Sequence, residues 1–286
     1  MHPDEGAGYF WCEPSAKSIN QRRYSPSHRR MSQNIRLAVA AAGGAVVAGA
    51  LYALWQKKKK SVKLSNAKLT YFGIHGAGEK VRLALVATGT PFEDDRVAFD
   101  TWMERKKTCK YGQLPILSID GEEYYQSDAM LRYIGAYCGS GKLYPTDDPA
   151  LTFAIDEAFG LCEDFDRAWN PCVYIAMRPA AYGYGDDFTG DKKTEVVKSL
   201  REKFVENELP RFMGYFSARL EKSVFLVGDS LTIADLRLLP RLLYFAKGKA
   251  DHVSSDVLKP YPLVTAYMER VMSIPSIAAW YADPSH

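Results

Sequence analysis

Two short motifs contain residue types that suit the binding of a small extended peptide. Pro115 follows Leu114 at the start of the apolar run QLPILSID, where a trans proline would forfeit a hydrogen bond of the sheet. A cis Leu114–Pro115 bond would instead turn the backbone of Leu114 outward, where it can pair with such a peptide. Taken alone, the same motif also fits a proline on an edge strand.

The dipeptide Gln126-Ser127 opens an apolar stretch that is typical of a helix. Ser127 is the predicted N-cap, and its hydroxyl, its N–H and the positive end of the helix dipole together suit a carboxylate. A plain helix cap is the alternative interpretation, and one serine can serve both purposes.

Three further side chains are candidates by type and position. Trp102 and Lys106 are four residues apart, so they share one face of a short helix or loop. Tyr71 stands near the end of KLTYF, which alternates like a strand. Each also fits a structural role: surface packing for the pair, and a half-buried strand position for Tyr71.

The elements that must position these residues form a small α/β unit followed by helices. KLTYF, PFEDDRVAF, QLPILSID and GEEYYQ predict strands, the last two joined across Asp120-Gly121, a strong hairpin signal. EKVRLALVATG and SDAMLRYIGAYCG predict helices, and TWMERKKTCKYG a short helical stretch. Beyond Pro145 and Pro149, helices are predicted near residues 151–169, 191–222, 232–247 and 262–272, with Thr232 and Asp235 forming a capping box at the third of them.

Charge and hydrophobicity divide the 286-residue chain into a basic leader and an acidic body. Residues 1–68 carry a net charge of +9 and residues 69–286 a net charge of −6. The body therefore lacks the cationic face that nucleic-acid binding needs. Twenty uncharged residues, Leu37 to Gln56, are long enough to cross a bilayer, and Lys57 to Lys60 follow them as a polybasic stop. A cleaved transit or signal sequence is the alternative.

These features predict five segments. They are a disordered basic leader (1–34), a transmembrane helix (35–56), a polybasic linker (57–67), a small α/β domain (68–145) and a helical C-terminal domain (149–286). The five cysteines form no zinc pattern and read as free thiols in a reducing compartment. We therefore predict a single-pass membrane protein with a cytosol-facing body, in the mitochondrial outer membrane or the endoplasmic reticulum.

Between residues 68 and 282 the chain resembles the cytosolic glutathione transferases, most closely their sigma-like class. The matching pieces, whose order and spacing are specific together, are KLTYF, the Trp and Lys of DTWMERK, YGQLPIL, Gln126-Ser127 and GDSLTIADL. The resemblance implies a thioredoxin-like N-terminal domain, a helical C-terminal domain and, usually, a homodimer. It also implies that glutathione is the co-substrate.

The resemblance assigns glutathione contacts to residues of this sequence. Leu114 and Pro115 would hold the cysteinyl part, Gln126 and Ser127 the γ-glutamyl carboxylate, and Trp102, Lys106 and Gln113 the glycine end. Asp164 matches an acidic residue that reaches across the dimer interface toward the γ-glutamyl amine. The hydroxyl of Tyr71 would point at the sulfur and stabilise the thiolate.

The chemistry implied by the resemblance requires a thiolate. Lowering a cysteine-like pKa of about 8.5 by about two units takes roughly 2.7 kcal/mol, within reach of one charge-directed hydrogen bond. Ala77 stands where the family's run carries an arginine, so glutathione binding should survive better than turnover. Gly160 leaves the acidic cluster of the prostaglandin-synthase relatives incomplete, so no metal is expected.

The sequence thus predicts a transferase that conjugates glutathione to small hydrophobic electrophiles. The second-substrate pocket is expected at the loop after Tyr71 and around Trp169, Tyr174 and Met177. Two alternatives remain open: a glutathione-dependent isomerase, and a non-catalytic binding or scaffold protein with the same fold.

Overall fold

A computed structural model describes residues 61–284 of the chain. Its only sheet within these residues has four strands, β1 (Lys68–Phe72), β2 (Glu93–Val97), β3 (Ile116–Ile119) and β4 (Glu122–Tyr124), in the order β2-β1-β3-β4. β1 pairs in parallel with β2 and antiparallel with β3, and β3 and β4 form the predicted hairpin. All four strands lie where the alternating segments of the sequence predict them.

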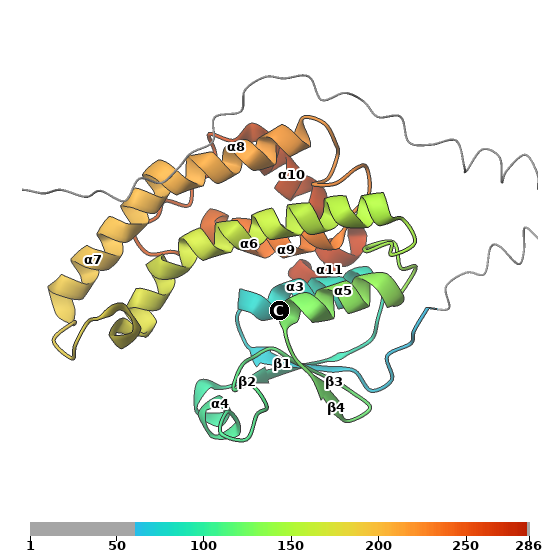
Figure 1. Cartoon of the computed structure of the whole chain (residues 1–286), viewed down its shortest axis with the longest axis horizontal. Helices are drawn as coiled ribbons and strands as arrows, with labels where there is room; N and C mark the ends of the chain where they lie inside the picture. Colours follow the sequence, from blue (N-terminus) through green and yellow to red (C-terminus); the bar gives the residue numbers. More distant parts are fainter. Residues whose placement is uncertain (1–60, 285–286) are drawn as a thin grey trace, which may run out of the picture. The chain divides into compact units, whose positions relative to one another are not determined.

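Three helices belong to this α/β part. They are α3 (Gly76–Ala87), α4 (Phe99–Arg105) and α5 (Ser127–Tyr137). α3 and α5 pack together on the face of the sheet that is turned toward the following helices, and α4 lies at the opposite side (Figure 1). Since α3 connects two parallel strands, it must cross over one face of the sheet.

The second part of the chain is entirely helical in the residues that the structure describes. Its elements are α6 (Pro149–Met177), the 3-10 turn η1 (Pro179–Tyr182), α7 (Gly190–Lys203), the π-helical turn η2 (Phe204–Glu208), α8 (Leu209–Leu220), α9 (Ile233–Ala246), α10 (Pro262–Met272) and α11 (Pro275–Ala282). The predicted fold class, a thioredoxin-like α/β part followed by a helical part, is confirmed.

One hydrophobic core runs through both parts. Leu69 of β1, Leu131 of α5, Phe165 of α6 and Leu239 of α9 all belong to it and are fully buried. α9 packs against α6 on one side and α3 on the other, so most of its residues are buried. The carboxylate of Asp235 accepts the N–H of Thr232 at 2.7 Å, which fixes the start of this central helix as the capping motif predicts.

Three features of the helical part differ from the prediction. α6 continues through Pro171 to Met177, eight residues beyond the predicted end. The stretch predicted as one helix at 191–222 contains the π-helical turn, which immediately precedes Leu209 and Pro210. Because proline has no N–H to donate, the regular α ladder cannot pass Pro210 unchanged. Helix α11 was not predicted.

The predicted membrane segment, Leu37 to Gln56, lies outside the described residues. Within residues 61–284, no helix has both the length and the apolar character needed to cross a bilayer. The described end of the predicted linker lies against the body: Leu64 and Ala67 are buried, and the N–H of Val62 donates to the carbonyl of Tyr137 at 2.7 Å.

Candidate active site

A shallow pocket lies where the strand β3 begins and the helix α5 begins. Five predicted residues line it, together with two tyrosines that were not assigned a role from the sequence. The lining residues are Tyr111, Gln113, Leu114, Pro115, Tyr125, Gln126 and Ser127. The Leu114–Pro115 peptide bond is cis, as the position of the proline predicts. The pocket therefore unites the motif predicted to pair with an extended peptide and the motif predicted to bind a carboxylate.

The backbone at Gln126 has a conformation that side-chain-bearing residues rarely adopt. Its φ is +70°, and it is the N-cap of α5, so Ser127 is the first helical residue rather than the predicted cap. The helix bonds to the carbonyl of Gln126 come from Ala129 and Met130, which leaves the first N–H groups of α5 free for another acceptor. A strained residue beside free donors is characteristic of a binding site.

Tyr71 is buried next to the first turn of α3, with 8% of its surface exposed. Its hydroxyl accepts the backbone N–H of Ala77 at 3.0 Å and donates to no described residue. Burial raises the pKa of Tyr71, although the N–H of Ala77 opposes this shift. The phenol therefore keeps its proton at neutral pH and has it available for an acceptor. Because the contact is with the backbone, the absence of an arginine side chain at Ala77 does not remove it.

Two glycines leave the space that the Tyr71 side chain occupies. A Cβ atom at Gly76 would lie 2.3 Å from the Tyr71 hydroxyl, and one at Gly78 would lie 2.5 Å from its ring. Gly76 also has a φ of +41°. Glycine is therefore needed at positions 76 and 78 for the Tyr71 side chain to fit. The sequence pattern did not predict this need.

Arg82 is a residue of this region that sequence reasoning missed. It is 1% exposed, and its guanidinium donates to the carbonyl oxygens of Ile74 at 2.9 Å and Phe72 at 3.0 Å. It also pairs with Asp94 at 2.8 Å, and its centre lies 5.7 Å from the Tyr71 ring. Arg82 therefore fixes the loop that follows Tyr71. The available signal was a charged residue within the apolar face of a helix.

Trp102 and Lys106 do not line the pocket. Trp102 is buried in α4, and Lys106 follows α4 as its exposed C-cap. The stem of Lys106 lies close to Gly112, because a Cβ atom built there would be 3.6 Å from Lys106 Cε. Gly112 directly precedes Gln113, so Lys106 lies near the lining of the pocket while Trp102 supports α4 from inside.

Asp164 is an exposed residue of α6 and is not part of the pocket within the described chain. Its carboxylate accepts a hydrogen bond from Arg167 at 3.1 Å, one turn further along the helix. Its predicted role across a dimer interface stays a prediction.

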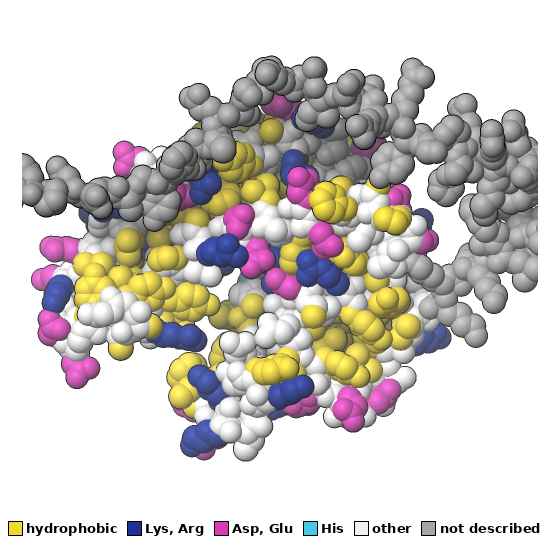
Figure 2. Space-filling view, viewed as in Figure 1, with side chains coloured by type: hydrophobic (Ala, Val, Ile, Leu, Met, Phe, Trp, Pro, Cys, Tyr) yellow, Lys and Arg dark blue, Asp and Glu magenta, His cyan; other side chains and the backbone are white. Residues whose placement is uncertain are grey.

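Trp169, which was expected to line the second-substrate pocket, is instead a core residue. Trp169 is 0% exposed and packs in the core, with its ring centroid 4.8 Å from those of Phe204 and Phe245. It therefore cannot contact a substrate. Tyr174 and Met177 are 37% and 64% exposed. Figure 2 shows hydrophobic side chains over the end of α6, beside a hollow that separates this end from the α/β part.

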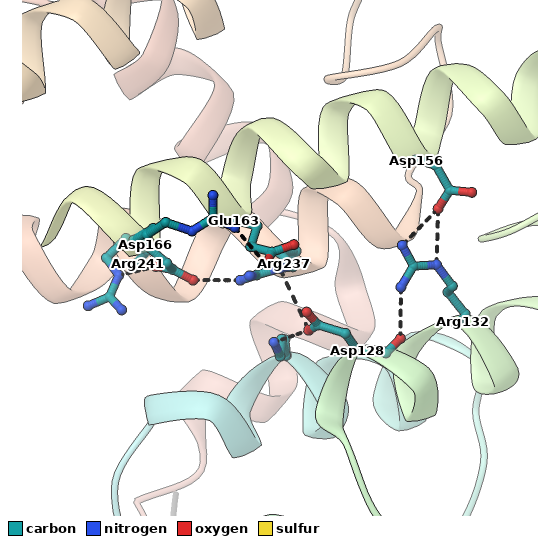
Figure 3. Close-up of polar contacts among 9 residues, drawn as sticks. Asp128, Arg132, Asp156, Glu163, Asp166, Arg237 and Arg241 are labelled. Carbon is teal, nitrogen blue, oxygen red and sulfur yellow. Dashed lines mark hydrogen bonds and ion pairs between the residues drawn. The ribbon is translucent and has the colours of Figure 1, made fainter. Parts of the chain in front are cut away.

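A chain of ion pairs joins the helical part to the start of α5 (Figure 3). The carboxylate of Asp166 accepts hydrogen bonds from Arg237 and Arg241, each at 2.6 Å. Arg237 also lies 3.6 Å from the carboxylate of Asp128, which in turn pairs with the buried Lys80. Because Asp128 follows Ser127, this chain of charges reaches the edge of the pocket.

Among residues 61–284, no group of three or more His, Cys, Asp or Glu side chains is placed to hold a metal ion. The four cysteines within this range are free thiols, and three of them are buried.

Comparison with known proteins shows the family to which this chain belongs. Two family models match: the glutathione S-transferase N-terminal domain over residues 67–136 and the glutathione S-transferase C-terminal domain over residues 185–284. Glutathione S-transferase 1 of Ascaris suum is 32% identical over 216 residues, which cover 76% of this chain and 95% of that relative.

Solved structures give the same result. The glutathione S-transferase from Ascaris lumbricoides is 31% identical with a TM-score of 0.60, and the match covers 77% of this chain and all of that one. Prostaglandin synthase D of Nilaparvata lugens is 26% identical with a TM-score of 0.63, over 77% of this chain and 98% of that one. The chain therefore belongs to the glutathione S-transferase family.

These matches correct the predicted membrane topology and location. They cover nearly the whole of each relative but only about three quarters of this chain. Within residues 61–284, no helix is able to span a membrane. The predictions of a transmembrane helix and of a single-pass membrane location are therefore withdrawn.

Proposed function

We propose that this protein conjugates the thiolate of glutathione to small hydrophobic electrophiles. The single observation that carries the proposal is the position of Tyr71. Its buried hydroxyl is occupied on the acceptor side by the N–H of Ala77 and keeps its own proton free to donate. A phenol in this state stabilises a thiolate more than a thiol, and this preference lowers the pKa of bound glutathione.

The γ-glutamyl end of glutathione would bind at the start of α5. The free N–H groups of its first turn and the hydroxyl of Ser127 support this assignment, because both suit a carboxylate. Gln126 would contact the same end. The backbone of Leu114, followed by Pro115, would pair with the cysteinyl part, since both residues line the same pocket.

The glycine end of glutathione would lie toward Gln113 and the ammonium group of Lys106. The proximity of the Lys106 stem to Gly112 supports this placement. Trp102 would act through the packing of α4 rather than through its exposed surface. We keep the homodimer, with Asp164 acting on glutathione of the partner subunit, as part of the proposal.

In the conjugation, the sulfur of glutathione forms a bond to an electrophilic carbon. The leaving group departs with the bonding electron pair, and the thiol proton passes to solvent. Tyr71 lowers the free energy of the anionic sulfur before attack, and the buried setting strengthens the hydrogen bond.

The test is an ultraviolet titration of bound glutathione in residues 61–286 and in its Tyr71→Phe variant. We expect the thiol pKa of the wild-type complex to lie about one to two units below that of the variant, because one charge-assisted hydrogen bond is worth about 1.5–3 kcal/mol. Equal pKa values in both proteins would refute the catalytic assignment. Glutathione binding without any thiolate would indicate a binding protein.

A prostaglandin-type isomerisation would use the same glutathione contacts. Conjugation and isomerisation assays on the same preparation separate the two reactions. Turnover in the isomerisation assay alone would replace conjugation as the function.

A further inference from the structure

We propose that Arg241 makes the second-substrate side of this site selective for electrophiles that carry a carboxylate. The inference rests on the proposed transferase function and adds a substrate class to it.

One hydrogen bond orients the guanidinium of Arg241, and its two terminal nitrogens remain available as donors. Its Nε donates to Asp166 Oδ1 at 2.6 Å, and its centre lies 5.5 Å from the ring of Tyr244. The terminal nitrogens donate no hydrogen bond to any residue between 61 and 284, and the side chain is 23% exposed. Figure 3 shows Arg241 at the outer end of the cluster of charges. Two parallel N–H donors in a fixed plane match a carboxylate.

The charges around Arg241 leave one positive charge without compensation. In the ion pairs among residues 61–284, Arg237, Arg241 and Lys80 face two carboxylates, those of Asp166 and Asp128. Lys80 and Arg237 are buried, so water compensates for this excess poorly. An anion bound at Arg241 would balance the cluster.

The helix that carries Arg241 packs against the helix whose first turn contacts Tyr71. These helices are α9 and α3, and the contact is through a backbone N–H of α3. While burial raises the pKa of Tyr71, the positive charge of Arg241 acts in the opposite direction, and Tyr174 also influences this pKa. On α6, Asp166 and Tyr174 are eight residues apart and share a helix face. Arg241 and Tyr174 are therefore both close enough to Tyr71 to act on its charge.

This arrangement defines how the substrate would lie. The carboxylate would accept from the terminal nitrogens of Arg241, and the apolar part would lie on Tyr174 and Met177, both of which are exposed. The glutathione sulfur would attack the electrophilic carbon between these two anchors. In an aryl chloride, the C–S bond forms, the C–Cl bond breaks, and chloride leaves with the bonding pair.

The test compares two aryl chlorides of similar size. One is 1-chloro-2,4-dinitrobenzene, which is neutral, and the other is 4-chloro-3-nitrobenzoate, in which a carboxylate replaces one nitro group. For Arg241→Gln, we expect the ratio of kcat/KM for the benzoate to kcat/KM for the neutral compound to fall about tenfold or more, because any effect of the lost charge on Tyr71 is shared by both substrates. Arg241→Lys should recover part of the loss, because it restores the charge without the planar donors.

A matched control removes one positive charge elsewhere. Lys198 is an exposed residue of α7, and its ion pair with Glu202 is long, at 3.8 Å. Lys198→Gln should leave kcat/KM unchanged for both compounds. Wild-type protein provides a measurement that does not depend on a variant: added sodium chloride should lower kcat/KM for the benzoate more than for the neutral compound.

The proposal is overturned if Arg241→Gln lowers kcat/KM equally for both compounds, or if salt affects them equally. Failure of the wild type to turn over either compound would instead count against the transferase function itself.

Discussion

The indole N–H of Trp280 donates a hydrogen bond to the carboxylate of Glu79 at 3.1 Å, and both side chains are buried. Trp280 belongs to α11 and Glu79 to the first turn of α3, so the bond ties the end of the described chain to the helix beside Tyr71. Glu79 also pairs with Arg82 at 3.2 Å. The C-terminal helix therefore takes part in the same buried network as the loop that follows Tyr71.

Replacement of Trp280 by phenylalanine should destabilise the protein by about 1–3 kcal/mol, because it leaves a buried carboxylate oxygen without its indole donor. Urea unfolding of the wild type and of Trp280→Phe measures this difference. Trp280→Ala, which also removes the ring from the core, should cost more. An unchanged urea midpoint in the phenylalanine variant would show that the bond contributes nothing to stability.

Substitution of Gly78 by alanine should displace Tyr71, because the added Cβ would lie 2.5 Å from its ring. We expect kcat/KM to fall about tenfold or more, with a loss of stability of about 1–3 kcal/mol from overpacking. Gly73 provides the control in the same loop, since no atom lies within 4 Å of a Cβ built there. Gly73→Ala should keep the wild-type activity. Equal losses in both variants would contradict the assigned role of Gly78.

Removal of the Ser127 hydroxyl should weaken glutathione binding more than it slows the chemical step. Ser127→Ala keeps the backbone N–H groups of α5, so we expect the KM for glutathione to rise about tenfold, equivalent to one lost hydrogen bond to a charged group. The fold should remain intact, because Gln126 rather than Ser127 is the N-cap. Steady-state kinetics at varied glutathione concentration measures the effect. A fall in kcat alone would place the carboxylate elsewhere.

Asp166 should contribute stability that is lost at acid pH. Burial alone would raise the pKa of Asp166, but the charges of Arg241 and Arg237 and their hydrogen bonds outweigh burial, so the pKa is lowered. A lowered pKa in the folded state gives stability that is present above the ordinary aspartate pKa, near 3.8, and that disappears as the pH falls through the folded value.

Urea unfolding of the wild type and of Asp166→Asn across pH 7 to pH 3 tests this dependence. The difference in unfolding free energy between the two proteins should be constant above about pH 5 and shrink below about pH 4. Glu163→Gln, at an exposed position of the same helix, should show a smaller difference throughout. A difference between wild type and Asp166→Asn that grows toward acid pH would contradict the sign.

The α/β part was predicted in detail because its strands alternate and its turns have characteristic residues. Asp120-Gly121 identified the β3–β4 hairpin, and both residues have a positive φ in the structure. Pro115 and Ser127 were singled out because proline restricts the backbone and serine favours the start of a helix, and both line the pocket.

Other features depend on tertiary contacts that no local pattern encodes. The large aromatic side chain of Trp169 suits a ligand pocket as well as a core. In the structure, the rings of Phe204 and Phe245 pack against it in the core. Arg82 and Arg241 were missed because their partners, Asp94 and Asp166, are distant in the sequence. The membrane segment was inferred from length and apolar character, which cannot separate a span from other apolar stretches.

The bond between Trp280 and Glu79 also has a consequence for biosynthesis. A chain emerges from the ribosome with its N-terminal residues first. The sheet and α3 are therefore synthesised well before their C-terminal partner, and the nascent protein must wait for α11 before the surroundings of Tyr71 can close. A chain that ends before Trp280 would contain every residue proposed to contact glutathione. It would lack the buried hydrogen bond that supports the loop after Tyr71.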